Sequence, residues 1–393
     1  MIPQVYYVAL VFGIHIVAVN LGIALSTMIP FLKRRADLSG NARLDDLAKR
    51  IFRVYAATYA LAGVMGTAFT VFLLSFYPEF IGIAGNITLV PFAIAIMSIL
   101  VHFLAIVLYY YGWDSFPRNL HLASGILLAL TSYTIPLGFR LVFSFLNIPV
   151  GLKFDGKPYI DAFEALLNPT FAPLYLKSIL GALTFGSLFI VTLATFNLMK
   201  GGSSEEKSLY SISLNVAFVS MFLMLLLGPW YAMSLISTPI KFDNIFRSFG
   251  WSVSGASGGP DLGWLFAIKL TLIIVQVYVL LNLTALRDGK PLPKQFRLAL
   301  LATLSAALTV LSGEYLNMFS QYPFFLANLP LIISQVPEPW RKILGKALSL
   351  ENVNPLSNDP SLLIVTAIGI LILLIAIGYF LYLVFFKKGP LIE

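Results

Sequence analysis

The chain of 393 residues contains three histidines, and each lies in or beside a long apolar segment. His15 lies in "GIHIVAVNLGIALS", His102 in "ILVHFLAIVLYYYGWD" and His121 in "NLHLAS". A neutral imidazole can ligate heme iron, and an imidazole that titrates near neutrality can carry protons. A histidine in an apolar segment can also form a hydrogen bond to a neighbouring helix, and His15 alone does not decide between these roles. His121 lies close to the predicted membrane surface and could simply be solvated.

One carboxylate stands out among 18 because it alone falls within a predicted membrane span: Glu314, in "LSGEYLNMF". It could pair with a cation, ligate a metal or relay protons. The chain has no HExxH spacing, phosphate loop or nucleophile elbow, so no metal centre is predicted. Because an unpaired charge in hydrocarbon is costly, polar residues at this depth should face the interior of the bundle. The further candidates are Asn20, Arg140, Lys177, Lys269 and Asn317.

The composition predicts that these residues are positioned by membrane-spanning helices. Hydrophobic residues make up 59% of the chain and charged residues 11%, whereas a soluble chain carries about 25% charged residues. Apolar runs of about 20 residues can each cross the bilayer. The fold class is therefore predicted to be all-α integral membrane, a nine-span transmembrane helical bundle forming a single domain over 1–393. The predicted spans are roughly 5–32, 51–77, 87–112, 119–147, 172–199, 209–236, 262–286, 295–319 and 361–386.

The basic residues of the loops predict the orientation of the chain in the membrane. Loops after the odd-numbered spans, with the C-terminal tail, carry roughly twice as many Lys and Arg as the other loops. The N-terminus is therefore expected outside, as are the Gly- and Ser-rich loop 237–261 and the loop 320–360, which includes a short surface helix at "EPWRKILGKAL". The net charge of +8 follows from this topology and indicates no nucleic-acid partner. The absence of cysteine excludes disulfides, iron–sulfur clusters and covalently attached c-type heme.

Four segments in order resemble subunit I of the cytochrome bd quinol oxidases, over roughly residues 5–330. They are "HIVAVNLGIAL", "YYYGWDSFPRNLHLASGILLALTS", "LNPTFAPLYLKSILGALTFGSLFIVTLATFNLMKG" and "SGEYLNMFSQYPF". The resemblance implies a cytochrome bd subunit I-like bundle in the plasma membrane of a prokaryote. Family members bind one low-spin and two high-spin hemes and couple quinol oxidation to oxygen reduction.

The low-spin heme positions of the family carry different residues in this chain. The histidine ligand falls on Lys177 and the methionine ligand on Thr271, while the family's nearby arginine falls on Lys269. A lysine must lose its proton before it can donate to iron. The resemblance therefore implies that this chain lacks the low-spin heme.

At the high-spin and proton-handling positions the match is partial. His15 matches a histidine that ligates a high-spin heme, which makes it a candidate heme ligand. The glutamate ligand falls on Leu311, and Glu314 lies one helical turn later as a weaker candidate. The two acids of the third span fall on Ile94 and His102, and a proton path through His102 and Glu314 is expected. The family's Gly-Arg-Gln-Pro-Trp segment has its Arg and Gln replaced by Gln321 and Tyr322, and its long quinol loop shrinks to 237–261.

The resulting hypothesis is a heme-poor paralogue of subunit I, holding at most one heme and not catalytic alone. It would pair with a heme-bearing subunit I-like chain of a bd-type oxidase, which it stabilises and shields, with possible small accessory membrane subunits, quinol and lipid as further partners. One alternative is an atypical redox subunit that holds one heme through His15, with Glu314 or His102. Another is a membrane transporter that uses the polar interior.

Overall fold

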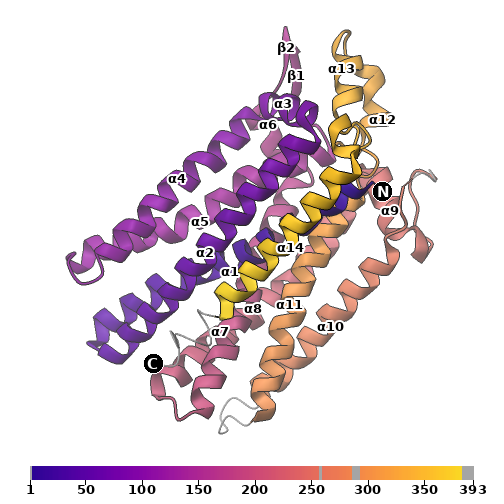
Figure 1. The fold of residues 1–393 in the computed structure, drawn as a ribbon. Coiled ribbons are helices and arrows are strands. Elements are labelled where there is room, and N and C mark those ends of the chain that lie inside the picture. Colours follow the sequence, from indigo (N-terminus) through magenta and orange to yellow (C-terminus); the bar gives the residue numbers. More distant parts are fainter. Residues whose placement is uncertain (1, 256–258, 286–292, 383–393) are drawn as a thin grey trace.

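The computed structural model describes residues 2–255, 259–285 and 293–382, and within them nine helices are long and apolar enough to span a membrane (Figure 1). This confirms the predicted all-α class with nine spans. Residue 286 of the seventh predicted span, 383–386 of the ninth and 256–258 of the loop 237–261 lie outside the described residues. The nine helices are α1 (Pro3–Ser39), α2 (Ala42–Phe76), α4 (Leu89–Tyr111), α5 (Arg118–Asn147), α7 (Phe171–Met199), α8 (Ser204–Ser234), α10 (Gly263–Ala285), α11 (Pro293–Phe319) and α14 (Pro360–Tyr382).

Local signals at the helix ends explain where several spans begin and end. Gly40 adopts a left-handed conformation (φ 64°) and ends α1, and the Asn41 side chain then accepts a hydrogen bond from the backbone N–H of Leu44 to start α2. A reciprocal capping box between Ser203 and Glu206 begins α8. Helix α1 therefore continues past its predicted end at 32, and helix α2 begins before its predicted start at 51.

Helices α1 and α7 form the centre of the bundle, and α14 lies at its edge. The most apolar window is 67% buried in α1 and 61% buried in α7, against 6% in α14. The two central helices approach closely where Gly186 of α7 meets Ala24 of α1. A Cβ atom at Gly186 would lie only 2.1 Å from the Cβ of Ala24. Small residues allow such close approach between membrane helices, which gain stability from dense packing.

Short elements gather at the end of the bundle that carries the N-terminus (Figure 1). The segment 148–171, expected only as a long loop, contains an antiparallel hairpin and a short helix; Gly156 (φ 69°) makes the turn. The loop 237–261 contains α9, and 320–360 contains α13 where the surface helix was expected. The short elements are α3 (Pro78–Ile87), β1 (Leu152–Asp155), β2 (Lys157–Ile160), α6 (Ala162–Leu166), η1 (Leu235–Ser237), α9 (Pro239–Phe246), η2 (Arg247–Phe249), α12 (Leu329–Ile332), η3 (Ile333–Gln335), α13 (Trp340–Ala347) and η4 (Pro355–Asn358).

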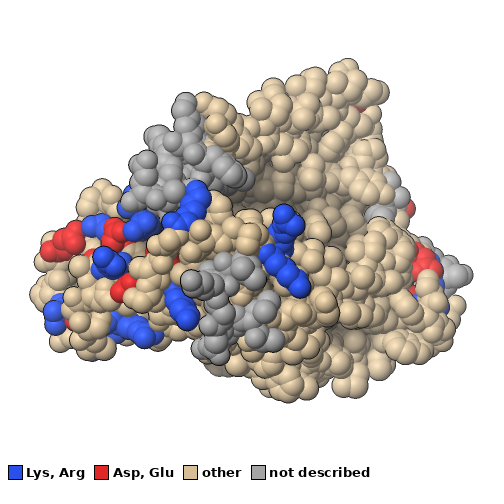
Figure 2. All heavy atoms as spheres, turned by 90° about the horizontal axis from the view of Figure 1, so that it is seen from below, with Lys and Arg blue, Asp and Glu red and all other residues tan. Residues whose placement is uncertain are grey.

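The opposite end of the bundle carries most of the visible Lys and Arg (Figure 2). The α1–α2 turn contributes Lys33, Arg34, Arg35 and Arg43 to this end. Basic residues favour the cytoplasmic side, so this distribution agrees with an N-terminus on the outside. The orientation of the chain in its membrane stays a prediction.

Candidate functional site

The centre of the candidate site is an ion pair at membrane depth between α5 and α11. Arg140 and Glu314 are 4% and 8% exposed. The Arg140 guanidinium donates from Nη2 to Oε1 of Glu314 at 2.6 Å and from Nη1 to Oε2 at 3.1 Å. The guanidinium also lies 5.4 Å from the centroid of the Phe143 ring. Both carboxylate oxygens are thus engaged by Arg140, and Glu314 is held as the partner of a cation rather than as a free iron ligand.

Three lysines surround this pair. Lys177 of α7 places its Nζ 4.0 Å from the centroid of the Tyr231 ring, in a cation–π contact. Lys269 of α10 lies against α11, where a Cβ atom at Gly313 would be 3.2 Å from its Nζ. Lys241 enters from α9 and is 1% exposed. Within the described part of the chain, none of the three has a carboxylate at ion-pair distance, so cations outnumber carboxylates here.

Lys241 was missed by sequence reasoning because it lies in a loop rather than in an apolar run. Its Nζ donates to the Asn147 side-chain oxygen at 2.7 Å and to the Asn317 backbone carbonyl at 3.1 Å. Gln321 donates to the same Asn147 oxygen at 3.3 Å. Burial lowers the pKa of Lys241 to about 7, although the nearby Glu314 carboxylate acts to raise it.

The shortened loop is folded around a second buried residue, Asp243. Its carboxylate accepts hydrogen bonds from the side chains of Ser252 and Ser254 and from the backbone N–H groups of Val253 and Ser254. Burial raises the pKa of Asp243, but these hydrogen bonds outweigh it and hold the pKa below its ordinary value. The adjacent Asn244 donates to the Ser320 carbonyl at 3.0 Å. The described part of the loop 237–261 therefore buries Lys241 in the interior of the bundle.

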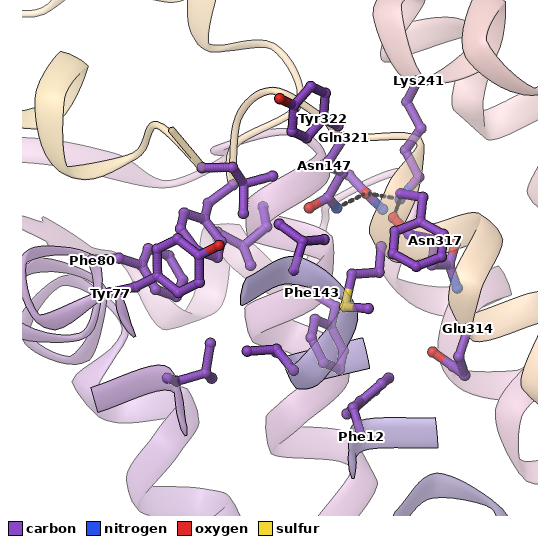
Figure 3. A pocket seen from close by; sticks show the side chains of 18 of the residues that line it. Phe12, Tyr77, Phe80, Phe143, Asn147, Lys241, Glu314, Asn317, Gln321 and Tyr322 are labelled. Carbon is purple, nitrogen blue, oxygen red and sulfur yellow. Dashed lines mark hydrogen bonds between the residues drawn. The ribbon is translucent and has the colours of Figure 1, made fainter. Parts of the chain in front are cut away.

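A cavity of about 110 Å³ lies beside these residues (Figure 3). Its polar lining includes Arg140, Asn147, Lys241, Glu314, Asn317 and Gln321, and much of its remaining wall is aromatic and aliphatic. Two buried donors in this wall, the Tyr77 hydroxyl and the Asn317 side-chain amide nitrogen, have no hydrogen-bond partner among the described residues. In Figure 3 the Tyr77 hydroxyl points from the left side toward the middle of the cavity.

His15 of α1 does not line this cavity. Phe12, also of α1, and Phe69, of the neighbouring α2, do line it. Its Nδ1 lies 2.8 Å from the Ala62 carbonyl, to which it must donate a proton. The ring packs so closely on α2 that a Cβ atom at Gly66 would be 2.8 Å from Cε1. A metal-bound histidine commonly makes such a hydrogen bond through its other nitrogen, so His15 itself is compatible with ligation.

The family's other heme-ligand positions do not fit a heme. Thr271 is exposed, and its hydroxyl donates to the Ala267 carbonyl of its own helix at 3.0 Å. Lys177 is engaged with the Tyr231 ring. Leu311 packs so tightly on α1 that its Cδ1 would lie 2.6 Å from a Cβ atom at Gly13. Over the described ranges, no group of three or more His, Cys, Asp or Glu residues could hold a metal ion.

His102 is a buried hydrogen-bonding residue that links three helices. Its Nε2 lies 2.5 Å from the Tyr55 hydroxyl of α2, and its Nδ1 lies 2.6 Å from the Thr131 hydroxyl of α5. Thr131 in turn donates to the Leu127 carbonyl at 2.7 Å. Because Thr131 uses its proton there, His102 Nδ1 must donate to Thr131, and Nε2 must accept from Tyr55. Both ring nitrogens are therefore paired, and the series of hydrogen bonds ends on a backbone carbonyl.

The Gly-Trp-Asp turn after α4 has a structural role. The Trp113 ring nitrogen donates to the Asp45 carboxylate at 3.2 Å, and the Lys33 ammonium lies 5.3 Å from the Trp113 ring centroid. His121 is buried rather than solvated, because it is only 2% exposed. Its ring stacks on Tyr109 with centroids 4.2 Å apart, and its Nε2 donates to the Tyr109 carbonyl at 3.1 Å. This turn ties α4 and α5 to the α1–α2 hairpin.

Comparison with known proteins assigns the family. The family model for cytochrome bd terminal oxidase subunit I matches residues 6–243. The chain belongs to this family. As a cytochrome bd subunit I family member with nine apolar helices among its described residues, it is a multi-pass protein of the bacterial plasma membrane. The match spans α1 to α9 and so includes His15, His102, Arg140, Lys177 and Lys241.

Two further comparisons agree with this assignment. A Bacillus subtilis protein, provisionally named cytochrome bd menaquinol oxidase subunit I, is 25% identical over 200 residues. That alignment covers 49% of this subunit I family member and 44% of the relative, so it spans less than half of the relative's length. The structure of bd oxidase from Geobacillus thermodenitrificans matches with a TM-score of 0.81 at 17% sequence identity, covering 99% of this chain and 98% of that chain. The bd-oxidase fold is thus present along nearly the whole chain.

Proposed function

We propose that this chain is a heme-poor subunit of a cytochrome bd-type terminal oxidase complex, in which a partner chain carries the hemes. Membership of the subunit I family supports a role in quinol oxidation coupled to oxygen reduction. The heme-poor assignment rests on the surroundings of the residues that occupy the family's heme-ligand positions. Lys177 lies on an aromatic ring, Thr271 is exposed and bonded to its own helix, and Leu311 packs against α1.

The proposed partner is a heme-bearing chain of the same architecture. Two similar nine-span bundles can pair about a pseudo-twofold axis when the same face of each bundle forms the interface. In such a complex this chain would stabilise the partner and shield its heme site from lipid and water, with small accessory membrane subunits as further neighbours. The peripheral α14, of which only 6% of the most apolar window is buried within the chain, leaves apolar surface for lipid or another subunit.

Measuring the heme content and the subunit composition of the purified complex tests this proposal. We expect the chain expressed alone to give a pyridine hemochrome signal near zero, and the purified complex to contain a second, heme-bearing subunit. We also expect His15→Ala to leave the heme content of the complex unchanged. Loss of one heme per complex in His15→Ala would instead support the alternative of one heme held through His15, which its Nδ1 hydrogen bond to the Ala62 carbonyl favours. Purification without any heme-bearing partner would contradict the oxidase proposal and support a transporter.

His102 and Glu314 stay candidates for a proton path, and a substitution at His102 separates that role from a structural one. If His102 carries protons, His102→Leu should leave the complex assembled and slow its proton-coupled turnover. Tyr55→Phe should slow turnover as well, because it removes the hydroxyl that donates to His102 Nε2 while keeping the ring. Turnover is measured per assembled complex across a range of pH. Unchanged turnover at every pH, with a lower melting temperature, would identify His102 as a packing and hydrogen-bonding residue.

A further inference from the structure

Tyr55 of α2 and His102 of α4 form a hydrogen-bonded pair that is closed off from solvent, with exposed fractions of 0% and 1%. The Tyr55 hydroxyl lies 2.5 Å from His102 Nε2. It donates to this nitrogen, because the imidazole proton is on Nδ1, where it is donated to the Thr131 hydroxyl. The phenol proton therefore points at an imidazole nitrogen that carries none. At this distance a proton can pass directly from the oxygen to the nitrogen.

Tyr55 differs in this respect from the other tyrosines that are fully buried. Tyr77 and Tyr109 are each 1% exposed, and neither hydroxyl has a hydrogen-bond partner among the described residues. Removing an electron from a phenol makes it strongly acidic, and without a base the positive charge stays in an apolar interior, which is unfavourable. Of these three tyrosines, Tyr55 alone has an imidazole within hydrogen-bond distance, and imidazole readily takes up a proton near neutral pH.

The surroundings of His102 can hold an imidazolium once the proton has moved. An imidazolium donates from both ring nitrogens, and the oxygens of Tyr55 and Thr131 are in place as its two acceptors. The Tyr59 ring centroid lies 5.1 Å from that of His102, within the range of about 6 Å over which an aromatic ring attracts a cation. Thr131 donates onward to the Leu127 carbonyl, so this series of hydrogen bonds ends inside the protein. Such a closed series suits a proton that crosses one bond and returns.

Aromatic rings connect Tyr55 with the end of the bundle that carries the α1–α2 turn. The centroid of the Phe52 ring lies 5.7 Å from that of Tyr55 and 6.1 Å from that of Trp113. Trp113 follows α4 and lies beside α2, where its ring nitrogen donates to the Asp45 carboxylate at 3.2 Å. Electrons tunnel readily between aromatic groups that are this close. An electron can therefore leave Tyr55 in this direction, although Tyr55 itself is out of reach of solvent.

We propose that Tyr55 is a redox-active tyrosine whose oxidation is coupled to proton transfer to His102. A one-electron oxidant removes an electron from the Tyr55 phenol, the phenol O–H bond breaks, and the proton forms a new N–H bond at His102 Nε2. The products are a neutral phenoxyl radical, an imidazolium and an oxidant reduced by one electron. In the complex proposed above, the oxidant would be a radical species of partly reduced oxygen, so the physiological role of the pair rests on the proposed function. The pair would take up an oxidising equivalent that would otherwise attack the surrounding lipid.

Flash oxidation of the full-length chain, in the form in which it purifies, tests the pair with an oxidant supplied from outside. A light flash generates tris(bipyridine)ruthenium(III) in the presence of an irreversible electron acceptor, and electron paramagnetic resonance of samples frozen after a delay measures the phenoxyl radical that persists. We expect a persistent radical in the unmodified chain and at least fivefold less of it in Tyr55→Phe. No heme and no partner takes part, so failure of this experiment is distinct from failure of the oxidase proposal.

Two further variants separate the base from the hydrogen bond. His102→Gln keeps an oxygen that can accept from Tyr55 and an amide that can donate to Thr131, but it cannot take up the proton, so we expect at least fivefold less persistent radical. Tyr109→Phe is the matched control, because it removes an equally buried hydroxyl that has no partner among the described residues, and its radical yield should equal that of the unmodified chain.

An unchanged radical yield in Tyr55→Phe or in His102→Gln would overturn the proposal, as would an equal loss in Tyr55→Phe and Tyr109→Phe. Should His102→Gln fail to fold, the comparison of Tyr55→Phe with Tyr109→Phe still decides whether Tyr55 holds the radical.

Discussion

Glu314→Leu is expected to destabilise the chain by about 3–5 kcal/mol, the cost typical of breaking a buried ion pair by removing one partner. The substitution leaves the Arg140 guanidinium, which is 4% exposed, without a counter-ion. It also removes the carboxylate whose charge acts on Lys177, Lys269 and Lys241, so four cations would share one interior region. The measurement is the thermal unfolding of the purified protein in detergent, followed by the fraction that remains monodisperse after heating.

Two controls show whether this cost comes from the buried charge. Asp46→Leu removes an ion pair with Arg50 in which the Asp46 side chain is 52% exposed, and it should cost less than about 1 kcal/mol. The double variant Arg140→Leu/Glu314→Leu removes both charges and should recover much of the stability lost in Glu314→Leu, because the interaction between neighbours is not additive. A similar small loss in Glu314→Leu and Asp46→Leu would contradict the role given to the buried pair.

The nine spans could be predicted from the sequence because each is a long apolar run, and bilayer thickness sets the length of such a run. The contacts between residues at the candidate site could not be predicted in this way. The sequence left pairing, ligation and proton relay open for Glu314. Its partner Arg140 lies 174 positions away in the sequence, and only the packing of α5 on α11 brings the two together. Lys241 gave no signal, since a lysine in a polar loop is normally solvated, whereas α9 folds inward and buries it.

The resemblance to subunit I located the heme-ligand positions, but their present roles depend on packing. The sequence indicated that Lys177 and Thr271 are poor iron ligands. It did not indicate that Lys177 would lie on Tyr231, or that Thr271 would be exposed on the outer face of α10. His121 shows the same limit: its position near a span end allowed solvation, yet the Gly-Trp-Asp turn and Tyr109 bury it. Contacts between helices, rather than the pattern within one helix, decide these environments.

Gly186→Ala is expected to be the most damaging single-methyl change in the centre of the bundle. The added Cβ would lie 2.1 Å from the Cβ of Ala24, whereas carbon atoms in contact are separated by about 3.5–4.0 Å. Neither atom can move away by rotating a side chain, so the backbones of α1 and α7 must separate. Overpacking of this kind costs about 1–3 kcal/mol and occasionally more, and it should lower the melting temperature of the purified chain.

Gly181→Ala on the same helix is the matched control. A Cβ atom at Gly181 would meet only the flexible end of Met224, at 3.7 Å, and alanine has a higher helix propensity than glycine by about 1 kcal/mol. Gly181→Ala should therefore be neutral or stabilising. Equal melting temperatures for the two variants would mean that α1 and α7 do not approach as closely as the structure shows. A loss confined to Gly186→Ala would show that this contact holds α1, which carries His15, against α7, which carries Lys177.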